Sequence, residues 1–153
     1  MAFASPKVRL PKQPAIVPAL KSCIWLSPDG EVEHIDHETA RGRIGKTVIP
    51  IVCHARSTAR RLSTAYFPAL DILELFAFTH PAQFALPTPL GIAEALGLTL
   101  PSSPERAAES LMTSALAMLT DLEDDRRGGE DAIAIATAMV QSGWTWGPAV
   151  LTA

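Results

Sequence analysis

The chain changes character near residue 54, because its strand-like segments come before that position and its helix-like segments after it. Thr47–Cys53 is a continuous apolar, β-branched run, typical of a strand buried on both faces. Ser22–Ser27 and Glu31–Asp36 flank the turn signal Pro28-Asp29-Gly30 and predict a β-hairpin. Pro50 interrupts the buried run, and we expect its nitrogen, which cannot donate a ladder hydrogen bond, to face no partner.

Residues that start and stop helices divide the rest of the chain into about five helices. The expected helices are Ala55–Leu62, Asp71–Thr79, a segment from Thr88 to Gly97, a long segment from Ser103 to about Arg126, and Asp131–Ser142. Asp71 and Glu74 form a capping box, in which Asp71 caps the helix and Glu74 reaches back. Leu75 and Phe76 then lie on the apolar stripe and are expected in the core. In the long helix the apolar face consists of Leu111, Ala115, Met118 and Leu122.

These elements predict an α/β fold, in which a small sheet of about three strands is followed and covered by about five helices. The 153 residues suffice for one domain. Prolines punctuate the first residues, so we expect an extended leader over residues 1–20, one α/β domain over 21–148, and a tail or linker over 149–153. Residues 36–45 are polar and predict a loop or a frayed helical turn.

Composition excludes several classes of protein. The net charge is −3 and the isoelectric point about 5.8, which excludes a generally basic nucleic-acid coat. The chain has neither a run of 18 apolar residues nor a secretory signal at its start, so no membrane contact and a cytoplasmic location are expected. Two cysteines are too few for a disulfide scaffold. The motifs of phosphate loops, dinucleotide folds, zinc proteases and serine hydrolases are absent from the sequence.

Two groups of residues could bind metal. Asp36 and Glu38, in Asp36-His37-Glu38-Thr39, have the Asp-x-Glu-Thr pattern that opens many two-metal nuclease sites, although a polar loop is the simpler interpretation. Zinc-type donors are present at His34, His37, Cys53 and His54. Cys53 and His54 are adjacent on a strand and should point to opposite faces, which argues against a shared zinc site and against a Cys–His nucleophile.

Two further groups bear on nucleic acid. Arg56, Arg60 and Arg61 form a basic stripe on one short helix, which could contact phosphates or simply face solvent. Trp144 and Trp146 could stack on bases, but packing is the simpler interpretation. A run of acidic residues near the end of the long helix is expected to be a solvated face; it consists of Asp121, Glu123, Asp124 and Asp125.

Three stretches, Val48–Leu62, Leu70–Phe76 and Thr88–Leu98, resemble the middle of the DEDD proofreading-exonuclease family. The resemblance implies an RNase H-like fold. In that family a strand ending in His-Asn precedes an Asp-bearing helix, then Asp-Thr-Leu opens another helix, and a Leu-x-x-Leu helix ends in Leu-Gly. His54 and Asp71 match the His after the strand and the Asp before the Leu-rich helix.

The helix end Ala95-Leu96-Gly97 also matches, and Gly129-Glu130-Asp131-Ala132 loosely resembles the last acidic motif. The metal ligands do not match. Ala59 stands where the family's second metal-binding Asp belongs, Ala55 replaces the Asn, and Cys23–Leu26, taken as the opening strand, carries no acid. The resemblance therefore implies a degenerate exonuclease architecture without a catalytic site.

A narrower resemblance covers roughly residues 22–148 and is strongest over Asp71–Gly97. Two segments are similar to the N-terminal region of alphaproteobacterial DinG-type ATP-dependent DNA helicases: Leu70–Leu98 and the closing Gly-Trp-Thr-Trp-Gly-Pro of Gly143–Pro148. This implies a non-catalytic accessory domain, active in DNA repair, that docks to the helicase motor or guides single-stranded DNA. The motor domains, with ATP and Mg²⁺, would lie outside this chain, which itself needs no cofactor.

The expected partners are therefore DNA, bound weakly and without sequence preference, and the motor domains of the same parent chain. Arg56, Arg60 and Arg61 are the DNA-binding residues that the sequence favours. Two alternatives stay open. One is an active metal-dependent 3′–5′ exonuclease that uses Asp36, Glu38 and Asp131, and the other is a free-standing interaction module.

Overall fold

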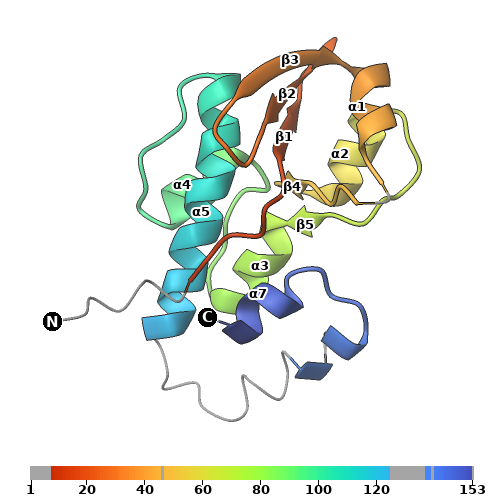
Figure 1. The fold of residues 1–153 in the computed structure, drawn as a ribbon. Helices are drawn as coiled ribbons and strands as arrows, with labels where there is room; N and C mark the ends of the chain where they lie inside the picture. Colours follow the sequence, from red (N-terminus) through yellow and green to blue (C-terminus); the bar gives the residue numbers. More distant parts are fainter. Residues whose placement is uncertain (1–7, 46, 125–136, 139, 153) are drawn as a thin grey trace, which may run out of the picture.

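The computed structural model describes residues 8–45, 47–124, 137–138 and 140–152 and has a mixed α/β architecture (Figure 1). A five-stranded sheet has the strand order β3-β2-β1-β4-β5. The strands are β1 Ala15–Pro18, β2 Ser22–Leu26, β3 Val32–Asp36, β4 Ile51–Val52 and β5 Leu70–Asp71. Strands β1, β2 and β3 are antiparallel neighbours, whereas β4 pairs parallel to both β1 and β5.

The sheet has five strands instead of the expected three or so. The first unexpected strand, β1, lies in the segment interpreted as an extended leader and is the middle strand of the sheet. Its apolar residues Ala15 and Ile16 are 0% and 1% exposed. Pro14 precedes this strand and Pro18 ends it, so neither proline removes a hydrogen-bond donor from the middle of the strand. The carbonyl of Pro14 accepts a hydrogen bond from the Ile51 amide at 2.8 Å. The second unexpected strand is the two-residue β5.

The predicted hairpin is confirmed, since β2 and β3 pair antiparallel from Ser22↔Asp36 to Leu26↔Val32. Gly30 in the connecting turn has φ +95°, a conformation that other residues rarely adopt. The segment after the hairpin is a helix, α1 His37–Arg43, where a loop or frayed turn was expected. Asp36 caps it by accepting a hydrogen bond from the Thr39 amide at 2.7 Å.

The predicted strand Thr47–Cys53 is shorter than expected, because only Ile51–Val52 form β4. Pro50 lies just before the strand, and its carbonyl accepts a hydrogen bond from the Leu70 amide at 2.8 Å. Val48 instead makes an isolated antiparallel bridge with Gly45. Pro50 therefore ends the regular ladder on this side, as the loss of its amide donor requires.

The named helices after residue 54 are α2 Ala55–Arg61, α3 Ile72–Thr79, α4 Pro89–Ala95, α5 Pro104–Asp124 and α7 Gly147–Thr152. Asp71 and Thr88 cap α3 and α4 with their side chains, as predicted. The expected helix Asp131–Ser142 lies mostly outside the described residues, although residues 137–138 and 140–141 are helical. Residues 149–152, expected to be part of a tail, belong to α7.

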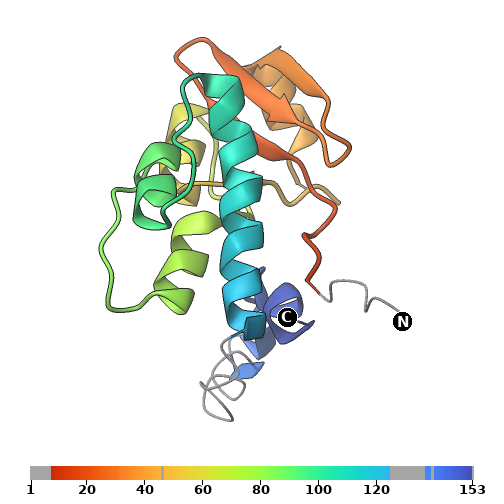
Figure 2. The same ribbon diagram turned by 90° about the vertical axis from the view of Figure 1, so that its left-hand side faces the viewer.

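Two hydrophobic clusters lie on opposite faces of the sheet. The larger one joins Ile24, Leu26 and Ile51 to α3, α4 and α5, and contains Leu75 and Phe76 as predicted. The smaller one joins other sheet residues, such as Cys23 and Trp25, to α1 and α2. Alternate residues of β2 thus enter different clusters, as strand geometry requires. Figure 2 shows α5 crossing in front of the sheet, and Figure 1 shows α1 and α2 on the side of the sheet opposite to α4 and α5.

The predicted apolar face of α5 is confirmed, because Leu111, Ala115 and Met118 are at most 1% exposed and Leu122 packs against the same cluster. Among the described residues, no helix combines the length and the apolar character needed to cross a membrane.

Candidate functional site

Three adjoining hollows surround the side chain of Tyr66, and we call them together the Tyr66 groove. Their volumes are about 380, 490 and 440 Å³, and Tyr66 lines all three. The first is bordered by Arg56 and Arg60 of α2, and the last by Trp144 of the C-terminal segment. The middle hollow shares Arg56 with the first and Glu74 with the last. The groove thus runs from α2, past Tyr66, to the closing segment of the chain.

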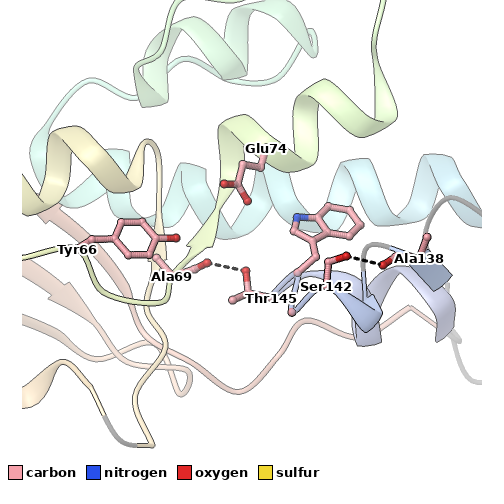
Figure 3. A pocket seen from close by; sticks show the side chains of 8 residues that line it. Tyr66, Ala69, Glu74, Ala138, Ser142 and Thr145 are labelled. Carbon is pink, nitrogen blue, oxygen red and sulfur yellow. Dashed lines mark hydrogen bonds between the residues drawn. The ribbon is translucent and has the colours of Figure 1, made fainter.

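Figure 3 shows the part of the groove nearest the C-terminus. Tyr66 comes from the loop between α2 and β5, Glu74 from α3, and Ser142 and Thr145 from the C-terminal segment. The hydroxyl of Thr145 donates a hydrogen bond to the carbonyl oxygen of Ala69 at 2.6 Å. Segments that are more than 70 residues apart in the chain therefore form the walls of one groove.

The structure separates the three arginines that the sequence assigned to DNA. Arg56 and Arg60 line the Tyr66 groove, whereas Arg61 lines a different hollow of about 230 Å³. This hollow, which is not part of the Tyr66 groove, lies at the ends of β1 and β4, where Pro18 and Cys53 border it. Successive helical residues are rotated by about 100°, which turns Arg61 away from Arg60. All three side chains are exposed, and among the described residues none of them forms an ion pair.

Asp71 forms the floor of the groove, and its side chain does more than cap α3. One carboxylate oxygen accepts hydrogen bonds from the amides of Leu73 and Glu74 at 2.9 and 3.3 Å. The other oxygen accepts from the amide of Ala55 at 2.9 Å, so the same side chain also holds the start of α2. The residue is 4% exposed. The indole of Trp146 donates to the carbonyl oxygen of Asp71 at 2.7 Å and attaches the C-terminal segment to β5.

Two other polar groups border the groove near Trp144. Burial, and next the charge of Asp71, raise the pKa of Glu74 above its ordinary value. The indole N–H of Trp144 is buried and interacts with the carboxylate of Glu74, which partly offsets the rise in the pKa of Glu74. The Trp144 ring packs against Phe78, with ring centroids 5.0 Å apart. Trp146 is fully buried. For this tryptophan, the interpretation as a packing residue is therefore confirmed.

The structure argues against a Cys–His nucleophile. Burial, and next the charge of Asp71, raise the pKa of the Cys53 thiol to about 12, which disfavours the reactive thiolate. The neighbouring His54 uses Nδ1 to bond the hydroxyl of Ser57 at 2.8 Å. Burial likewise raises the pKa of Cys23 to about 11.

The four zinc-type donors have separate surroundings. His34 lies 3.0 Å from the carboxylate of Glu105, and Nε2 of His37 donates toward the carbonyl oxygens of Ala19 and Ser22. Within the described ranges, no three His, Cys, Asp or Glu side chains come together as a metal-binding group.

The acidic residues considered for a nuclease site either belong to the start of α1 or lie outside the described residues. Asp36 is the N-cap of α1, and Glu38 is an exposed residue of its first turn. Asp131 lies outside the described residues. Of the acidic run on α5, Asp121 lies 3.7 Å from His80, and Asp125 also lies outside the described part.

Sequence reasoning missed Tyr66, which is 74% exposed in the middle of the groove. A signal was present: Tyr66 and Phe67 are adjacent aromatics just before Pro68, and extended segments before proline turn alternate side chains to opposite sides. Phe67 is 7% exposed, so its burial forces Tyr66 outward. Comparisons of the chain with protein-family models, with curated proteins and with solved structures found no match.

We expect Asp71→Ala to cost about 3 kcal/mol of unfolding free energy, because the amides of Ala55 and Glu74 lose their acceptor and the Leu73 amide keeps only its 3.2 Å bond to the Cys53 carbonyl. Asp36→Ala is the matched control, since Asp36 also caps a helix but is exposed and accepts from one amide only. The control should cost about 1 kcal/mol. Urea unfolding of the two variants measures the difference, and equal costs would show that the bond to Ala55 contributes nothing.

Proposed function

We propose that this chain is a non-catalytic accessory domain of an ATP-dependent DNA helicase, built on a degenerate RNase H-like exonuclease architecture. It guides single-stranded DNA or docks against the motor, and its DNA contact is weak and independent of sequence. ATP and Mg²⁺ would be bound by motor domains outside this chain, and the protein would act in DNA repair in the cytoplasm. The observation that carries the DNA part of the proposal is the position of Arg56 and Arg60 on the Tyr66 groove, where neither forms an ion pair with another described residue.

The strand order supports the proposed architecture. RNase H-like sheets have the order 3-2-1-4-5, with the first three strands antiparallel and the last two parallel to the first. The order β3-β2-β1-β4-β5 and its pairing directions agree with that arrangement. The helices α1 and α2 come in the expected places, before and after β4.

The side chains at the metal-binding positions support a non-catalytic role. The opening strand is β1, not Cys23–Leu26 as the sequence suggested, and its residues Ala15-Ile16-Val17-Pro18 also carry no acid. Ala59, at the place of the family's second metal-binding Asp, is 6% exposed and packs in the smaller core cluster. Two-metal catalysis depends on carboxylates that hold the ions, and these positions supply methyl and aliphatic groups instead.

Charge supports a local DNA contact. The whole chain carries a net charge of −3, so it attracts phosphates only where cations are concentrated. The three arginines of α2 lie within six residues of one another and have no competing ion pair in the described part of the chain. This is enough for a weak, salt-sensitive contact that is insensitive to base sequence.

Binding to single-stranded DNA should weaken with salt at a log–log slope of about −1.4, as two phosphates neutralised by Arg56 and Arg60 require. The double variant Arg56→Ala/Arg60→Ala should have a slope of about 0, because both contacts on the groove are removed. Fluorescence anisotropy over a salt series measures both. The control Arg43→Ala/Arg106→Ala removes two exposed arginines that pair with Glu33 and Glu109 elsewhere, and it should keep the parental slope. Equal losses in both variants would contradict a specific contact on α2.

We also expect no metal-dependent degradation of DNA. The chain is incubated with labelled single-stranded DNA and Mn²⁺ or Mg²⁺, and the products are separated by size. Degradation that disappears in an Asp36→Ala variant would establish the exonuclease alternative and overturn the non-catalytic role.

The helicase part of the proposal makes a genetic prediction. The reading frame that encodes this chain should also encode a nucleotide-binding loop of the Gly-Lys-Thr type. Sequencing of the full transcript tests this, and a frame without such a loop would favour a free-standing interaction module.

A further inference from the structure

We infer that Tyr66 is a stacking platform for an unpaired base of single-stranded DNA, with the neighbouring phosphates held by Arg56 and Arg60. This inference rests on the proposed DNA contact and specifies its site and substrate: an unpaired strand that follows the Tyr66 groove, with duplex DNA excluded.

The ring of Tyr66 is presented to solvent and has open space around it. It is 74% exposed and lines the three hollows of the groove. Within the described residues, the structure has no hydrogen bond from its hydroxyl and no aromatic ring stacked on it. Every base offers a flat face that can stack on such a ring, whichever the sequence, but only when the base is unpaired.

The backbone that carries Tyr66 is held on both sides, so binding would not have to order it. Before it, Ser63 adopts φ +52° and its amide bonds the carbonyl of Arg60, while the amide of Thr64 bonds the carbonyl of Ala59. After it, Phe67 is buried and Ala69 accepts the hydrogen bond from Thr145. A pre-positioned aromatic residue loses little conformational entropy on binding.

The charges around the ring orient the strand. Arg56 and Arg60 lie on one side of Tyr66, where they can neutralise phosphates. Glu74 lines the middle hollow together with Arg56 and also the hollow next to the C-terminal segment. It would repel phosphates there, but its carboxylate can accept hydrogen bonds from base amino groups. The backbone of the strand should therefore follow α2, with the base edges directed toward α3 and the C-terminal segment.

The site excludes Arg61, which borders the separate hollow at the ends of β1 and β4. The arginines thus provide an internal test of the path: Arg60→Ala should weaken single-strand binding more than Arg61→Ala. Equal effects of the two changes would overturn this path along the groove.

The main test compares Tyr66→Ala, Tyr66→Phe and the parent chain by anisotropy, with a labelled single-stranded oligonucleotide of mixed sequence and with the matching duplex. Tyr66→Ala should weaken single-strand binding by about 5- to 150-fold, the range for loss of one stacked base. Tyr66→Phe keeps the ring and should bind as the parent does. Phe84→Ala, which removes another exposed aromatic outside the groove, should also have no effect. The parent should bind the single strand more tightly than the duplex.

The outcomes separate this inference from the proposed function. If Tyr66→Ala binds single-stranded DNA as the parent does while Arg56→Ala/Arg60→Ala loses binding, the stacking platform is wrong and the proposed DNA contact stands. Equal parental affinity for single strand and duplex would likewise overturn the platform alone. If the parent chain binds no DNA at about 50 mM salt, where phosphate contacts are strong, both the platform and the DNA part of the proposed function are wrong. Circular dichroism of Tyr66→Ala checks that the exposed position tolerates the change.

Discussion

The carboxylate of Asp71 is the interaction on which the arrangement of this fold depends. It accepts amide hydrogen bonds from Ala55, Leu73 and Glu74 and so fixes the starting points of α2 and α3 relative to each other. A buried carboxylate is costly unless such donors surround it. The starts of two helices provide those donors, because the first amides of a helix have no partner within it. The middle hollow of the Tyr66 groove lies between these two helices, so the Asp71 carboxylate holds the two walls of that hollow together.

The C-terminal segment completes the same construction. Trp146 donates to the carbonyl of Asp71, and Thr145 donates to that of Ala69, two residues earlier on the same backbone. A strand as short as β5 has few ladder bonds of its own, and these side chains add hydrogen bonds that attach it to the C-terminal segment. The closing Gly-Trp-Thr-Trp-Gly-Pro motif is thus a structural element that attaches the end of the chain to the sheet, and its other tryptophan, Trp144, forms one wall of the groove.

The sequence predicted those elements whose signals are local. The hairpin follows from its turn residues, and α3 and α4 follow from the caps Asp71 and Thr88. It did not predict β1 and β5, because both are short and are formed by pairing with distant residues: Ala15 pairs with Ile51, which in turn pairs with Leu70. The sequence spacing put the three arginines of α2 in one group. Arg61 follows Arg60 directly, and the turn of the helix between them places Arg61 in another hollow. Tyr66 was missed because its exposure depends on the burial of Phe67.

The Tyr66 groove does not coincide with the place where the proposed exonuclease architecture would have its catalytic site. In the proposed architecture a catalytic site would lie at the carboxyl ends of β1 and β4, and the hollow there, of about 230 Å³, is the smallest of the four described above. Pro18 and Cys53 border it, and neither is a carboxylate. The larger hollows lie across α2, around Tyr66, where two arginines face solvent. Under the proposed function, DNA is expected along the Tyr66 groove and not at this smaller hollow. Contact through the other side of α2 would instead hold a strand without bringing its phosphates to a catalytic centre.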